Sequence, residues 1–156
     1  MPMQINVGDH VSSEASYTPV PSHLRGSLRW ARTKANEIAR KIPRANVYFR
    51  GLPGGRSLSA LLADTAIWIN YSVGLAAYGE TNAVGGKEIA IGPLAFRIGR
   101  WTVLATLIHE LAHSNGAPGG VDRAAEEAVL ACGLGTGSER GAGDDPFTPY
   151  DPNIGG

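Results

Sequence analysis

The sequence predicts an α+β fold, and three observations lead to this prediction. First, the 156 residues of the chain are enough for one domain with a sizeable core. Second, two short apolar runs, at 66–72 and 87–91, have the length and composition of strands. Third, segments of helical periodicity lie on either side of these runs, above all 22–42 and 100–113. Interleaved strands and helices are typical of a sheet covered by helices.

In the first half of the chain we expect a polar lead, two helices and a strand. Residues 1–21 are polar and contain three prolines, so they predict an extended or disordered lead before the domain. Ser22 is a candidate N-cap of a helix that ends before Pro43. Residues 46–50 are rich in β-formers and predict a short strand, and a short helix is expected over 57–64.

In the second half we expect a helix pair between loops. Residues 100–113 contain no Gly or Pro, and their apolar residues repeat at three and four. A sharp turn at 116–120 follows, and Asp122 is a candidate N-cap of a second helix that reaches about Cys132. The folded domain is thus predicted to cover 22–134, followed by a Gly/Pro-rich tail over 135–156.

Composition limits the possible functions. The formal net charge is zero, which argues against nucleic-acid binding driven by bulk charge. The single cysteine, Cys132, excludes an intrachain disulfide, and we expect it to be a small buried helix residue rather than a nucleophile. No signal peptide or membrane span is predicted. We therefore expect a cytoplasmic protein, or one exported without a classical leader or as part of a larger polypeptide.

The most informative stretch is His109-Glu110-Leu111-Ala112-His113, an HExxH motif. Residues four apart lie on the same face of a helix, so two imidazoles at this spacing can bind one Zn²⁺ ion. Random placement at this composition produces the motif in roughly 0.5% of chains, before any helical context is required. The helical context is present here, so the sequence predicts His109 and His113 as metal ligands.

A catalytic zinc ion usually has three protein ligands and a water. Three carboxylates on the second helix are candidates for the third ligand: Asp122, Glu126 and Glu127. We favour Glu126, because Asp122 has a competing role as the helix cap and Glu127 lies beside apolar neighbours and Arg123. The sequence leaves all three open.

The expected chemistry follows from these residues. Zn²⁺ lowers the pKa of a coordinated water and polarises a carbonyl group. Glu110 would act as general base and pass the proton to the leaving amine. A donor to the oxyanion is also expected. Tyr78, Tyr150 and His10 are conceivable donors, and nothing in the sequence selects one.

The HExxH motif followed closely by a carboxylate-bearing helix resembles the zincin metallopeptidases. This resemblance implies that a small mixed β-sheet packs on the HExxH helix, which is followed by a second helix carrying the third metal ligand. It also implies that an edge strand binds substrate in extended form, and the strand around 88–91 is the candidate. The motif continues as HExxHxxGxxG, similar to the metzincins, but Gly119 stands where their third ligand would be. A glutamate on a second helix is closer to the gluzincins. The stretch 101–135 also resembles toxin-type metallopeptidase domains of bacterial secretion-system effectors, which implies a secretion-system carrier or an immunity protein as partner.

Three functions are therefore weighed on the sequence. The leading one is a zinc metallopeptidase that cleaves a protein or peptide substrate, as an effector or toxin domain. The second is a zinc amidase acting on a non-protein amide such as peptidoglycan. The third is a non-catalytic binding module stabilised by zinc. Glu110 argues against the third, because a structural site needs no general base beside its ligand.

Overall fold

The computed structural model describes residues 2–119 and 123–134, and in it helices accompany a four-stranded mixed sheet. The predicted α+β class is therefore confirmed. The strands are β1 (Gln4–Ile5), β2 (Trp68–Tyr71), β3 (Gly79–Thr81) and β4 (Glu88–Ile91). The helices are α1 (Arg25–Lys41) with a 3-10 turn before it (Ser22–Leu24), α2 (Pro43–Arg50), α3 (Leu58–Leu62), α4 (Pro93–Ile98), α5 (Arg100–Ser114) and α6 (Ala124–Ala131).

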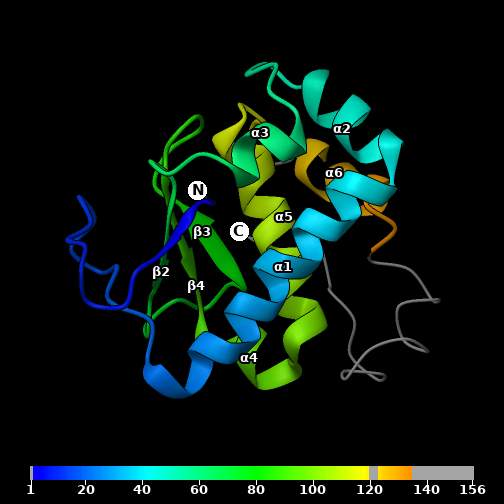
Figure 1. Ribbon diagram of the computed structural model, residues 1–156. Helices are drawn as coiled ribbons and strands as arrows, with labels where there is room; N and C mark the ends of the chain where they lie inside the picture. The colour runs from blue at the N-terminus through cyan, green and yellow to red at the C-terminus, as the bar shows by residue number, and fades with distance from the viewer. Residues whose placement is uncertain (1, 120–122, 135–156) are drawn as a thin grey trace.

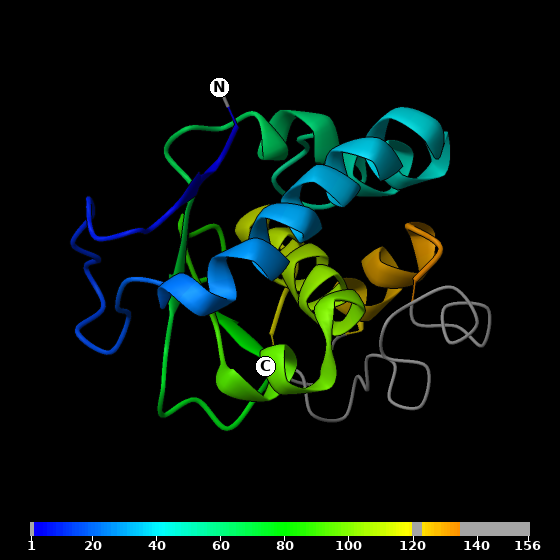
Figure 2. The same ribbon diagram turned by 60° about the horizontal axis from the view of Figure 1, so that its bottom comes forward.

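The sheet has the strand order β1-β2-β4-β3 (Figure 1). β1, β2 and β4 run parallel, and β3 pairs antiparallel with β4. The helices lie on one side of the sheet in both views (Figures 1 and 2). Because β4 is paired on both sides, the expectation that it is the substrate-binding edge is wrong. β3 is the edge strand at this side of the sheet.

Helix α5 is the centre of the molecule. It packs against α1, α4 and α6 and against strands β3 and β4. Every residue from Thr102 to His113 is buried, so the polar face of the helix is enclosed along with the predicted apolar stripe. Gly99 and Gly116, both with positive φ, stand at the two ends of α5, where glycine most easily lets the chain change direction.

Residues 46–50 form part of helix α2, so the predicted strand is wrong. Pro43 occupies the first turn of α2, where its fixed φ favours a helix and its missing N–H costs nothing. Ala45 and Phe49, four residues apart, are both fully buried. The Tyr48 hydroxyl donates to the Ala124 carbonyl 2.7 Å away. Tertiary packing thus outweighs the β-propensity of this segment.

The extended or disordered lead predicted for residues 1–21 is also wrong, over the residues of this segment that the structure describes. β1 joins the sheet, Met3 and Val20 are fully buried, and Thr18 forms a bridge with Tyr71. The segment between β1 and α1 runs along the side of the sheet away from α5 (Figures 1 and 2). These residues are an integral part of the fold.

The second predicted helix is present as α6, and Gly133 with positive φ follows it. Asp122, its expected cap, and the predicted tail over 135–156 lie outside the described residues. No helix in the described ranges is both long and apolar enough to cross a membrane.

Candidate metal centre

The two motif histidines meet at their Nε2 atoms, which lie 3.1 Å apart. Both side chains are buried near the C-terminal end of α5, one turn apart, as the spacing predicts. Two nitrogens bound to one tetrahedral zinc at about 2.0–2.1 Å are about 3.3 Å apart. The observed separation fits a shared zinc ion.

His113 is held by a contact that also selects its tautomer. Its Nδ1 lies 2.8 Å from the carbonyl oxygen of Ala117, in the turn after α5. A carbonyl oxygen only accepts, so Nδ1 carries the hydrogen and donates it. In the neutral ring, Nε2 then keeps its lone pair for a ligand. Metal-binding histidines commonly have such a partner on the second nitrogen.

Glu110 is enclosed between α5 and the edge strand β3, and only 1% of it is exposed. Its Oε1 accepts a hydrogen bond from the Thr81 hydroxyl at 2.9 Å. Its Oε2 is buried without a hydrogen-bond partner among the described residues. This oxygen lies 3.9 Å from Nε2 of His109. An acceptor left open beside the two converging nitrogens is what a general base at a zinc site would require.

The surroundings of Glu110 change its acidity. Burial raises its pKa, the Thr81 hydrogen bond lowers it, and the charges of Glu80 and Glu126 raise it again. The outcome is a pKa of about 8 against an ordinary value of 4.5. A cation in this site would favour the ionised form and lower that pKa.

Strand β3 reaches Glu110 because of Gly79. A Cβ at position 79 would lie 2.6 Å from Cγ2 of Thr106 and 3.2 Å from Cγ of Glu110. Only glycine therefore lets β3 approach α5 this closely. Thr81, two residues on, points to the same face of the sheet. The sequence pattern indicates neither residue, because a three-residue strand gives almost no periodic signal.

The structure separates the candidates for the third ligand. Oε1 of Glu126 lies 3.9 Å from Nδ1 of His109, whereas Oε2 of Glu127 lies 3.5 Å from the Tyr48 hydroxyl. Asp122 is outside the described residues. Glu126 is thus next to the histidine pair, but on the edge of the His109 ring away from Nε2. No group of three potential ligands is present among the described residues.

A small cleft opens at this site. It has a volume of about 140 Å³ and is lined by residues of β3, the following loop, α5 and the turn after α5: Glu80, Thr81, Ala83, Val84, Glu110, His113 and Gly119. Gly119, which stands where a metzincin would have its third ligand, therefore lies at the same cleft. It offers no side chain, and a Cβ added there would meet nothing within 4 Å.

The candidates for the oxyanion donor were His10, Tyr78 and Tyr150. His10 stacks on Trp68, with ring centroids 4.0 Å apart, and its Nε2 is 2.9 Å from Glu88. It belongs to the segment between β1 and α1, and it contacts strands β2 and β4. Tyr78 is fully buried, and Tyr150 lies outside the described residues. Among the described residues, neither His10 nor Tyr78 lines the cleft.

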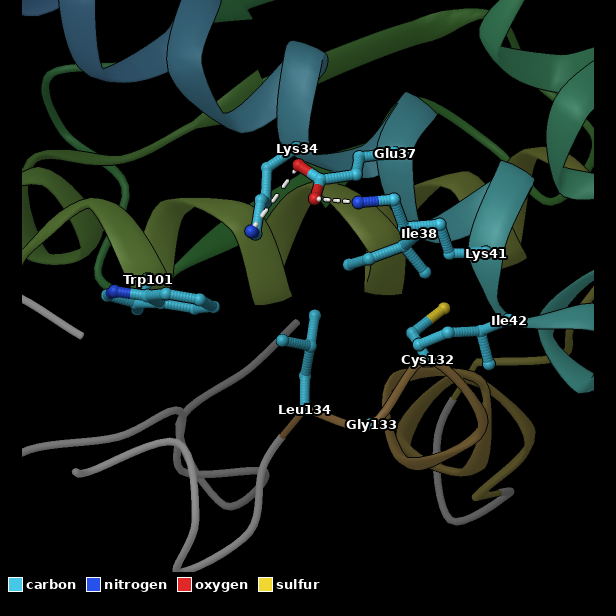
Figure 3. Close-up of a pocket in the computed structure, with 9 residues that line it drawn as sticks. All are labelled: Lys34, Glu37, Ile38, Lys41, Ile42, Trp101, Cys132, Gly133 and Leu134. Carbon is cyan, nitrogen blue, oxygen red and sulfur yellow. Dashed lines mark hydrogen bonds and ion pairs between the residues drawn. The ribbon is translucent and has the colours of Figure 1, made fainter. Parts of the chain in front are cut away.

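A second cavity, of about 230 Å³, lies between α1 and the end of α6 (Figure 3). It contains none of the motif residues. Cys132 lines it, but only 2% of this residue is exposed, and burial raises the pKa of its thiol to about 12. The thiol is therefore neutral near pH 7, as expected for a structural cysteine rather than a nucleophile.

No protein-family model, curated protein or solved structure gives a significant match to this chain.

Proposed function

We propose that this chain is a zinc-dependent metallopeptidase with His109 and His113 as metal ligands and Glu110 as general base. One observation carries the proposal: the two Nε2 atoms converge at 3.1 Å, and the open Oε2 of Glu110 lies 3.9 Å from one of them. The resemblance to zincins and the predicted helical spacing support the same conclusion.

Each residue has a separate task in this proposal. His113, fixed by Ala117, and His109 would hold the metal through their Nε2 atoms. A zinc ion would supply Lewis acidity toward the scissile carbonyl and toward water. Glu110 would take a proton from the attacking water on Oε2 and pass it to the nitrogen of the leaving amine as the C–N bond breaks, while the Thr81 hydroxyl donates its hydrogen bond to Oε1. Burial of α5 keeps bulk water from the carboxylate and strengthens these interactions.

The position of β3 favours a peptide over other amides. β3 is the last strand of the sheet on the side of the cleft, and Glu80 and Thr81 line that cleft. An extended peptide can pair with the backbone of an edge strand, and its carbonyls then pass the catalytic groups. A non-protein amide such as that of peptidoglycan can use less of this edge, because pairing along a strand favours a long extended peptide chain.

The proposal is tested by measuring bound zinc and cleavage of unfolded protein substrates, with peptidoglycan as a second substrate. We expect the wild type to bind one zinc and to cleave protein. Glu110→Gln should retain zinc and lose at least a hundredfold in kcat, because general-base catalysis contributes about 10²–10⁴. Glu37→Gln, a surface carboxylate on α1, is the matched control and should behave as the wild type.

Three results would contradict the proposal. Purified wild type that binds no zinc would remove the metal site. Full activity in Glu110→Gln would remove the general base. Cleavage of peptidoglycan alone would change the reaction to that of an amidase.

A further inference from the structure

We propose that Thr81 is a positioning residue of this site: its hydroxyl holds one oxygen of Glu110 so that the other is directed at the metal-facing nitrogens. The inference depends on the proposed function, and it assigns a task to the edge strand β3 beyond substrate pairing.

The first step is the geometry of the carboxylate. The Thr81 hydroxyl lies 2.9 Å from Oε1 of Glu110 and 3.2 Å from the Glu110 backbone carbonyl oxygen. A hydroxyl has one hydrogen to donate, and the shorter contact is the one to the carboxylate. The other oxygen, Oε2, is the unpartnered one near His109. Fixing Oε1 therefore sets the direction of Oε2.

The second step is that no other described side chain restrains this carboxylate by a hydrogen bond. The backbone of α5 fixes the Cα position of Glu110 and packing against β3 confines its side chain, but rotation about the last torsion, which is broad for a carboxylate, still redirects Oε2. A displacement of about 1 Å of a reacting group is enough to lower the rate by about a hundredfold. The hydroxyl of Thr81 supplies the missing restraint.

The third step connects the restraint to β3. Gly79 allows β3 to lie against α5, and Thr81 follows on the same face. Any tilt of β3 moves the Thr81 hydroxyl and the backbone edge together. A peptide that pairs with this edge would therefore steady the general base as it binds.

The test compares Thr81→Val, which has nearly the same shape without the hydroxyl, with Thr81→Ser, which keeps the hydroxyl. We expect Thr81→Val to keep zinc affinity and KM within about threefold of the wild type and to lose about 10- to 100-fold in kcat. Thr81→Ser should keep kcat within about threefold. A merely structural role would change both variants alike, or would change zinc affinity and KM as well.

A second measurement does not depend on activity. In the metal-free protein, Thr81→Val should lower Tm by about 2–4 °C when Glu110 is present, since the buried carboxyl loses its donor. In a Glu110→Met background the same substitution should leave Tm unchanged. Equal losses in both backgrounds, or full kcat in Thr81→Val, would overturn the inference. If the wild type neither binds zinc nor cleaves protein, the proposed function fails, while the Tm comparison still decides whether Thr81 holds Glu110.

Discussion

The two histidines of the motif differ in what surrounds their outer nitrogens. Nδ1 of His113 donates to the Ala117 carbonyl at 2.8 Å, whereas Nδ1 of His109 faces the Glu126 carboxylate at 3.9 Å. At 3.9 Å this carboxylate is beyond hydrogen-bonding distance of the ring, but its negative charge favours a positive or metal-bound imidazole. Glu126 therefore stays a candidate for the third ligand or for a neighbour that acts on His109 from the other side of its ring, and the two roles differ in how strongly its loss would weaken zinc binding.

This difference gives a prediction for zinc affinity. Glu126→Ala should weaken zinc binding by about 10- to 100-fold, the usual loss when an orienting partner is removed. Glu127→Ala should change it by less than about threefold, because that carboxylate lies beside the Tyr48 hydroxyl. Competition with a chromophoric chelator measures both. A loss above about a thousandfold in Glu126→Ala would make Glu126 the direct ligand, as the sequence favoured. A larger loss in Glu127→Ala would transfer the role to Glu127.

The motif residues themselves were predictable, because the i, i+4 spacing on a helix determines which side chains meet. The contact between Thr81 and Glu110 was not predictable. The two residues are 29 apart in sequence, and their contact depends on the pairing of β3 with β4 and on the space that Gly79 leaves. Ala117 was missed for a related reason, since a backbone carbonyl leaves no sequence signal.

Among the elements, those with a long uninterrupted pattern were predicted well. α1 and α5 have apolar residues at helical spacing between clear breaks, and β2 and β4 are short apolar runs. α2 was mistaken for a strand because 46–50 is rich in β-formers, although Pro43 favours a helix start. β1 and β3 have two and three residues, too few for any period to show.

One buried side chain joins the end of α5 to the segment after α2. Asn115 donates to the carbonyl oxygens of Phe49 and Arg56, both at 2.8 Å, and accepts from the Arg56 N–H at 3.2 Å. Asn115→Ala would leave these buried or partly buried groups unpaired and should lower the free energy of unfolding by about 2–3 kcal/mol. Urea denaturation measures it. Asn36→Ala, which removes an exposed contact on α1, should cost less than about 0.5 kcal/mol. Equal costs would contradict a structural role for Asn115.

At the scale of the whole molecule, the sheet is covered on both sides. Helices cover one side, and the segment between β1 and α1 runs along the other (Figures 1 and 2). That segment is anchored by buried Val20 and by the hydrogen bond from the Tyr17 hydroxyl to Glu80 on β3, 2.7 Å long. The packing of this segment on the sheet could not be predicted from the sequence. The segment is mostly polar, and its buried contacts come from single apolar residues that lie far apart. The edge strand β3 is thus held from both sides, by Tyr17 and by α5.

Enclosing Glu110 in this way should make the stability of the whole molecule depend on pH and, under the proposed function, on zinc. The pKa of Glu110 is raised from 4.5 to about 8 by burial in the metal-free protein. Because the folded-state pKa is the higher one, the stabilising contribution of protonated Glu110 is fully present below about pH 4.5 and is lost as the pH rises through 8. Relative to Glu110→Gln, the metal-free wild type should therefore lose several kcal/mol of unfolding free energy between these pH values.

Urea denaturation in a chelating buffer at several pH values measures this difference, and the contributions of groups present in both proteins cancel. Zinc should reverse the trend for the wild type, because it binds the folded state and favours the ionised carboxylate. The gain from zinc should increase with pH, since the histidine ligands must be unprotonated to bind. Parallel pH profiles for the two metal-free proteins would show that Glu110 is ionised at no cost, which would contradict its enclosure between α5 and β3.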